Sequence, residues 1–209
     1  MSDELSFRDV LGTGWKLTKE RVGLWLGLLG TFLVVGVVNA VIQGAVTNAG
    51  VKVVIGLVFQ FLQWYLTFNS LGVALAVVDG RAVSYADLWT PRGSFWFYVL
   101  ASLLYGLIVF GGTLLLIVPG VIWGLMFMFY GYVMIENKVG PLEALRVSKK
   151  LTAGAKADLF LFGLLTVGLN ILGLLFIGIG LIATLAITYF SMAYLYRWRT
   201  NVVGETPVA

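Results

Sequence analysis

The sequence contains no cysteine and no histidine, and only 11% of its 209 residues are charged. Without these two residue types, the chain has no disulfides, no thiol nucleophiles, none of the usual zinc ligands and no side chain that titrates near neutral pH. Most enzyme chemistry needs a nucleophile with its base, or a bound metal ion. The sequence therefore predicts a protein that is not an enzyme, with no cofactor, no metal site and no catalytic residue.

Charged residues are also missing from the middle of every long apolar segment. Proton pumps and many ion-coupled transporters keep such groups there, so ion-coupled transport is disfavoured. An enzyme that acts on lipid is an alternative, and for Glu136 we expect pairing with Lys138 or a capping role. The carboxylates expected near the membrane surface are dispersed, with no spacing that predicts a shared metal ion: Asp79, Asp87, Glu136, Glu143 and Asp158.

Long apolar segments dominate the sequence. Hydrophobic residues make up 60% of the chain and the mean hydropathy is +0.96, which leaves too little polar surface for a soluble protein. The segments approach the roughly 20 residues that cross hydrocarbon, and they lack the alternation of membrane β-strands. We therefore predict an all-α polytopic membrane protein in which an amphipathic segment (1–21) and a tail (197–209) flank one domain (22–196). Its six spans are expected at Val22 to Ile42, Val53 to Val78, Phe95 to Val118, Pro119 to Ile135, Asp158 to Phe176 and Ile179 to Tyr196.

The distribution of positive charge predicts the orientation. All Lys and Arg residues except Lys52 fall in the N-terminal segment, the second loop, the fourth loop and the tail. Basic residues near helix ends are retained on the cytoplasmic side. The sequence thus predicts a multi-pass protein of the cytoplasmic (inner) membrane with both termini in the cytoplasm. The outer connections are short, and Pro119 is expected to open the fourth span.

The segments before the first, third and fifth spans are weakly alike. Residues 6–11 and 84–89 share a serine, an aromatic ring and an aspartate at equal spacing, and Glu143 and Leu145 occupy two of these places in a third copy. The pattern predicts three units, each a surface-lying amphipathic helix followed by a membrane hairpin. Chance similarity between short amphipathic helices is the alternative.

The fourth loop carries the most informative pattern. Pro141 is expected to open a helix and Gly154 to end it, with leucines near one face and basic residues beside them. Such a helix can lie in the headgroup plane, where each basic group contributes about 1 kcal/mol near an anionic leaflet. The alternative is that the basic residues only orient the neighbouring spans. The predicted lipid- or partner-binding residues are Arg146, Lys149, Lys150 and Lys156.

Amides and hydroxyls recur at helical spacing inside the predicted spans. They could line a polar path, or they could form ordinary hydrogen bonds between helices, each worth about 0.6 kcal/mol. The path residues would be Asn39, Gln43, Gln60, Gln63, Asn170 and Thr188. Small residues at four-residue spacing predict close helix packing. These are Gly23 and Gly27, Gly36, Ala40 and Gly44, and Gly120 and Gly124, with Gly173, Gly178 and Gly180 expected at a tight reversal.

One region resembles a known family. The Pro119-Gly120 turn, Glu136, the stretch G-P-L-E-A-L at 140–145, Ser148 and L-T-A-G at 151–154 look like the membrane domain attached to some bacterial glycerophosphoryl diester phosphodiesterases. The region is also similar to related stand-alone six-span membrane proteins of bacteria and archaea. The match is carried by residues 115–162. In the fused enzymes a separate soluble domain performs hydrolysis, so the resemblance implies a fold and a location without diesterase activity.

These observations predict a non-enzymatic integral membrane protein that organises lipid or a protein partner through a basic cytoplasmic face. A passive channel or transporter for a small amphipathic or lipid-like substrate is the alternative. The expected partners are membrane lipids, including anionic ones, and a second copy of the chain or another protein. Nucleic acid is not an expected partner.

Overall fold

The computed structural model of this chain describes residues 6–90, 95–176 and 179–204. The described residues form helices and connecting turns, with no strand among them, so the predicted all-α class is confirmed. In chain order the elements are α1 (Phe7–Glu20), α2 (Val22–Ala45), α3 (Ala49–Val78), the 3₁₀ turn η1 (Tyr85–Leu88), α4 (Phe95–Leu115), α5 (Ile117–Met126), α6 (Tyr130–Asn137), α7 (Pro141–Thr152), α8 (Lys156–Leu175) and α9 (Ile179–Val203).

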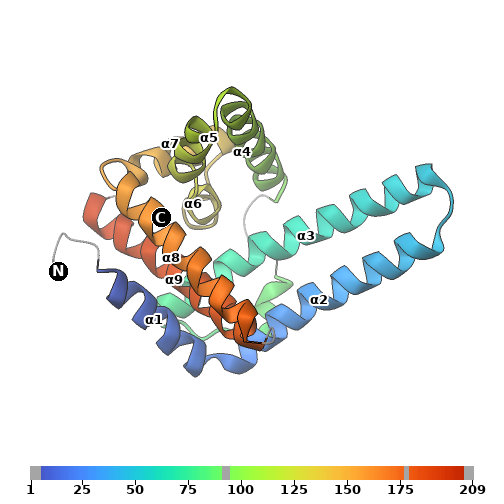
Figure 1. The fold of residues 1–209 in the computed structure, drawn as a ribbon, viewed down its shortest axis with the longest axis horizontal. Coiled ribbons are helices and arrows are strands. Elements are labelled where there is room, and N and C mark those ends of the chain that lie inside the picture. Colours follow the sequence, from blue (N-terminus) through green and yellow to red (C-terminus); the bar gives the residue numbers. More distant parts are fainter. Residues whose placement is uncertain (1–5, 91–94, 177–178, 205–209) are drawn as a thin grey trace.

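Three helical hairpins determine the shape of the molecule. The hairpin of α2 and α3 projects to one side, α4 and α5 pair at another corner, and α8 and α9 lie side by side through the body (Figure 1). The short outer connections bring each pair of helices close. Gly112 approaches Gly120 in the second hairpin, and Gly173 approaches Gly180 in the third.

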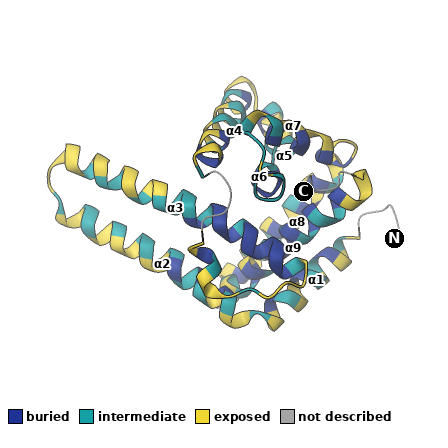
Figure 2. Ribbon diagram, turned by 180° about the vertical axis from the view of Figure 1, so that it is seen from behind, coloured by how far each residue is buried: buried dark blue, intermediate teal, exposed yellow. Residues whose placement is uncertain are grey.

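The core surrounds α9. Helix α1 runs along α9 and the second half of α3 packs against it, so side chains such as Phe190, Leu195 and Phe68 are buried. Burial is concentrated in this region and falls away toward the far end of the α2–α3 hairpin (Figure 2). The apolar side chains of that far end, Val41 and Val53 among them, are exposed. An exposed surface of this kind fits a lipid environment.

Five segments of the described chain are long and apolar enough to cross a membrane: Val22–Ala45, Ala49–Val78, Phe95–Leu115, Ile117–Asn137 and Lys156–Leu175. They indicate a helical membrane protein and agree with five of the predicted spans. The sixth predicted span, residues 179–196, falls within α9. This helix is packed among α1, α3 and α8 and continues past Tyr196 to Val203. Six spans therefore stay a prediction.

The predicted fourth span is interrupted. We expected one helix from Pro119 to Ile135, whereas α5 ends at Met126 and α6 begins at Tyr130. The placement of Pro119 in the first turn of a helix is confirmed, because α5 begins at Ile117 after an extended Leu116 and Pro119 is its third residue. Proline is tolerated there because N–H groups in the first turn have no helical acceptor.

The predicted surface helices differ from one another. Helix α1 is largely solvent-facing on one side, but its other side contacts α9: Ser191 Oγ donates to the carbonyl of Val10 at 3.1 Å. A Cβ on Gly14 would lie 2.7 Å from the carbonyl oxygen of Ile187, so glycine permits this contact. Before the second hairpin, the part of the chain that the structure describes contains the four-residue turn η1. The threefold repeat stays a prediction.

Candidate functional site

Helix α7 displays the basic residues of the fourth loop. It begins at Pro141 and ends at Thr152, shortly before Gly154 with its φ of 76°, so the predicted start and end are confirmed. Its apolar side is covered by protein, with Leu145 and Leu151 buried. Leu142 alone of the three predicted leucines is exposed, at 71%. The apolar face therefore packs α7 against the rest of the protein, and its place in the headgroup plane stays a prediction.

Arg199 holds the C-terminal end of α7. Its Nε donates to the carbonyl of Leu151 at 2.6 Å and its Nη2 to the carbonyl of Ala153 at 2.9 Å, so carbonyls without helical partners are satisfied. Burial lowers the pKa of this guanidinium, and the nearby charge of Asp158 partly offsets that effect. We expected Arg199 in a tail outside the membrane domain. The signal available in the sequence was the absence of Gly and Pro between Tyr196 and Gly204, since α9 continues to Val203.

Two of the four predicted binding residues share one hollow. Lys149 near the end of α7 and Lys156 at the start of α8 line an open depression of about 380 Å³ with Ala153, Gly154 and Ala157. Two cations from different helices thus face one space large enough for a small anionic group. Arg146 Nη1 instead donates to Glu143 Oε2 at 2.6 Å on the exposed side of α7, and Lys150 is also exposed. Neither lines the hollow.

A second hollow also has Lys149 in its lining. It is a groove between α4 and α5 with a volume of about 470 Å³, and its lining is mostly apolar. Its lining consists of Leu107, Ile108, Gly111, Leu115, Trp123, Met126, Phe127 and Lys149. A mostly apolar groove with a cation in its lining has a composition that fits an amphiphile.

The break between α5 and α6 is stabilised by hydroxyls of α7. Ser148 Oγ accepts from the Phe129 N–H at 3.1 Å and donates to the Met126 carbonyl at 3.2 Å. Thr152 Oγ1 lies 3.1 Å from the same carbonyl. Because an interrupted helix leaves backbone groups without partners, these contacts explain how the break is tolerated. They also position Met126 and Phe127, which line the second hollow.

We expect Ser148→Ala to lower the free energy of unfolding by about 1 to 2 kcal/mol, because the Phe129 N–H would be buried without a partner. Titration of the detergent-purified protein with a denaturing detergent measures this. Thr113→Ala is the control, since the exposed Thr113 hydroxyl bonds only the Val109 carbonyl of its own helix. Equal losses in the two variants would contradict the role given to Ser148.

A cluster of charges joins the ends of α3, α6 and α9. Arg197 Nη2 donates to Asp79 Oδ2 at 2.8 Å, and Arg197 Nη1 donates to Glu136. Tyr196 donates to the other oxygen of Glu136 at 2.5 Å. Burial opposes the charge of Arg197, but the hydrogen bonds and charges of Glu136 and Asp79 outweigh it and raise the pKa of the guanidinium. The expected pairing of Glu136 with Lys138 is wrong: its partners are on α9.

The predicted polar path is divided between two hairpins. Asn170 Nδ2 donates to Thr188 Oγ1 at 3.1 Å within the α8–α9 pair. Gln43 Nε2 donates to the Lys52 carbonyl at 3.0 Å within the α2–α3 pair. The remaining predicted residues lie on α2 and α3, where Asn39 and Gln63 are half-buried and Gln60 is exposed. These contacts have the form of hydrogen bonds between neighbouring helices, and the path stays a prediction.

The glycine predictions have mixed outcomes. A Cβ on Gly120 would lie 2.8 Å from the Thr113 nitrogen, and one on Gly173 would lie 3.0 Å from the Gly180 carbonyl carbon, so close packing is confirmed at these reversals. Gly178 lies outside the described residues. By contrast, a Cβ would meet nothing within 4 Å at Gly23, Gly36 or Gly44. Packing within one chain does not require glycine there.

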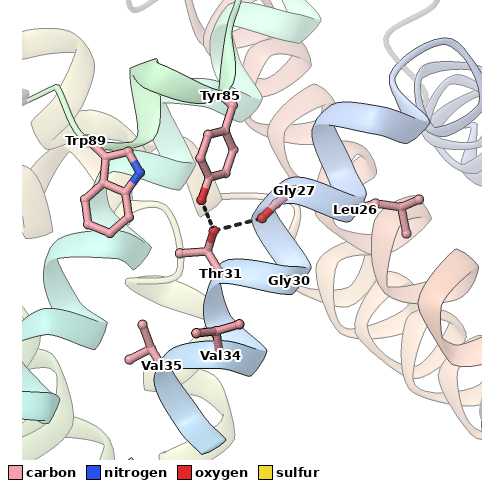
Figure 3. A pocket seen from close by; sticks show the side chains of 8 residues that line it. All are labelled: Leu26, Gly27, Gly30, Thr31, Val34, Val35, Tyr85 and Trp89. Carbon is pink, nitrogen blue, oxygen red and sulfur yellow. Dashed lines mark hydrogen bonds between the residues drawn. The ribbon is translucent and has the colours of Figure 1, made fainter. Parts of the chain in front are cut away.

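A third hollow, between α2 and η1, was not predicted from the sequence. Thr31 and Tyr85 form a hydrogen bond at its wall, and Trp89 faces the same space from beyond η1 (Figure 3). Gly27 permits the contact, because a Cβ there would lie 3.0 Å from the Tyr85 ring. Ser84 and Asp87, which cap η1, were a sequence signal for this turn but not for the hollow beside it. Its lining is uncharged, unlike that of the hollows at Lys149.

Within the described ranges, no group of three or more acidic side chains is arranged to hold a metal ion. Comparisons with protein-family models, with curated proteins and with solved structures gave no significant match. The resemblance to the membrane domain of the diesterases therefore stays a prediction, and the site itself is the basis for a functional proposal.

Proposed function

We propose that this chain is a non-enzymatic integral membrane protein that binds anionic lipid headgroups with the basic surface where α7 meets α8. In this proposal it lies in the inner cell membrane, with six spans and both termini in the cytoplasm. The apolar helices support the membrane location, and the concentration of basic residues in alternate connections supports the orientation.

One observation carries the proposal: Lys149 and Lys156 come from different helices and line the same open hollow. Lysines that only determine the orientation of the spans have no reason to line the same hollow, because that effect depends only on the side of the membrane on which they lie. Helix α7 is fixed by Arg199 and by its buried face, so the backbone of Lys149 has a defined position beside the start of α8. Two cations beside one space favour an anionic headgroup over a neutral one.

We expect the double variant Lys149→Ala, Lys156→Ala to bind anionic lipid about thirtyfold more weakly. The estimate is about 1 kcal/mol for each basic residue near an anionic leaflet, or about 2 kcal/mol in total. The measurement compares retention of phosphatidylglycerol and phosphatidylcholine by the purified protein, using native mass spectrometry.

The matched control is Lys16→Ala, Lys19→Ala, which removes the same charge from α1. Lys16 is exposed and pairs with Glu20 at 3.9 Å, while Lys19 lies over the Trp15 ring. The control should retain phosphatidylglycerol as the wild type does. Equal losses in the two double variants would mean that total charge, and not a site, attracts the lipid.

A further inference from the structure

The groove between α4 and α5 and the lysine hollow share one lining residue, and together they form the candidate site. Lys149 lines both spaces, and α7 contacts both α4 and α5 beside it (Figure 1). The neighbouring Ser148 bonds the Met126 carbonyl, so Lys149 lies at the α6 end of α5. From there the groove extends toward Leu115, next to the turn of the hairpin.

We propose that this combined site holds a single anionic phospholipid, with its phosphate between Lys149 and Lys156 and one acyl chain along the α4–α5 groove. The proposal deepens the proposed function and rests on it, because it assigns the lipid a binding place for one acyl chain as well as for its headgroup. We call the α4–α5 groove in this role the chain seat. The charge at one end and the apolar lining along the rest match the two chemical parts of such a lipid.

The length of the groove fits most of one acyl chain in a single leaflet. Leu107 and Leu115, at opposite ends of its α4 wall, are eight residues apart, which is about 12 Å along a helix. One leaflet contributes about 15 Å of hydrocarbon, half the thickness of the bilayer core. The length of the groove is therefore comparable to the depth of the hydrocarbon in one leaflet.

A peptide is a poorer occupant of the same groove. Its backbone N–H and C=O groups would need partners, whereas the lining offers only two side chains that can hydrogen-bond, the donors Lys149 and Trp123, and no side-chain acceptor of ordinary strength. Backbone polar groups buried without partners are costly. An acyl chain has no such groups and needs only packing contacts. Because bulk lipid also solvates the chain, the headgroup provides most of the selectivity, and the groove provides shape.

Gly111→Leu tests the chain seat directly. Gly111 lines the groove, and a Cβ there would meet no other protein atom within 4 Å. A leucine side chain at this position therefore fits the protein but occupies the space proposed for the acyl chain. Gly106→Leu is the control. Gly106 is also unobstructed on α4 but lies on the opposite face, outside the groove lining.

We expect Gly111→Leu to retain dioleoyl phosphatidylglycerol about tenfold less well than the wild type, as overpacking by 1 to 3 kcal/mol implies. Gly106→Leu should behave as the wild type does. Native mass spectrometry of the full-length protein gives both values, with dioleoyl phosphatidylcholine as the neutral lipid. Glycerol phosphate, which lacks a chain, should not displace the lipid.

The outcomes separate the two proposals. If Lys149→Ala, Lys156→Ala loses the lipid while Gly111→Leu retains it fully, the headgroup site stands and the chain seat is overturned. If the lysine variant also retains it, both are overturned. Displacement by glycerol phosphate would likewise overturn the chain seat.

A second measurement covers the case in which Gly111→Leu does not fold. Phosphatidylglycerol with brominated chains, diluted in phosphatidylcholine nanodiscs, quenches tryptophans that its chains touch. Trp123 lines the groove, so Trp123→Phe should reduce the quenched fraction of the emission. An unchanged quenched fraction would overturn the chain seat.

Discussion

Arg197→Ala is expected to lower the free energy of unfolding by about 3 kcal/mol. The side chain of Glu136 is only 11% exposed and that of Arg197 is 21% exposed, so the substitution leaves a mostly buried carboxylate without its cation. It also removes the link to Asp79 and thus the connection between α3, α6 and α9. Titration with a denaturing detergent, followed by circular dichroism, measures the change.

Two further variants test that explanation. Arg146→Ala removes an exposed pair with Glu143 and should change stability by less than about 0.5 kcal/mol. Glu136→Gln added to Arg197→Ala should recover part of the loss, because the uncompensated carboxylate is then gone. If the added substitution recovers nothing, the effect of Arg197 comes from packing alone.

Gly120→Ala is expected to destabilise the α4–α5 hairpin by about 2 to 3 kcal/mol. The new Cβ would lie 2.8 Å from the backbone nitrogen and 2.9 Å from the Cα of Thr113, so relief requires the two helices to separate. Side-chain rotation cannot remove a contact with backbone atoms. The midpoint temperature of unfolding in detergent should therefore fall.

Gly124→Ala, one helical turn later on α5, is the matched control. Its nearest neighbours would be the Tyr105 hydroxyl at 3.7 Å and Val109 Cγ2 at 4.0 Å, which are ordinary contacts. Alanine is the better helix former by about 1 kcal/mol, so this variant should be as stable as the wild type or more so. A comparable fall in both midpoints would show that the helices are not held at the separation described.

The helices themselves could be predicted from local sequence. Long apolar segments determine where α2, α3, α4 and α8 form, because hydropathy is summed over neighbouring residues. The start of α7 follows from Pro141 in the same way, since proline favours the first turn of a helix. Such features depend on a few adjacent positions, and those are visible in a single sequence.

The break at residues 127–129 could not be predicted, because its cause is distant in the chain. The residues there are as apolar as the helix around them, and the hydroxyls that satisfy the freed backbone come from Ser148 and Thr152. The partner of Glu136 was missed for a similar reason. Arg197 is far from Glu136 in sequence and meets it only after α9 has packed against the rest of the protein.

The candidate site was predictable in part. Charge clustering identified Lys149 and Lys156, but it could not distinguish them from Arg146, which points to Glu143. The apolar groove beside Lys149 was not predicted, since its walls come from α4 and α5 and their residues resemble any other apolar helix. Only the relative placement of three helices creates a space that has both a charged and an apolar end.

The last turns of α9 limit how this protein can be shortened or fused for experiments. Hydropathy places the membrane domain boundary at Tyr196, yet Arg197 joins three helices and Arg199 holds the end of α7. A shortened protein that stopped at Tyr196 would lose both, and with them the support of the lysine surface. Affinity tags and reporter fusions should therefore follow Val203, where the helix ends.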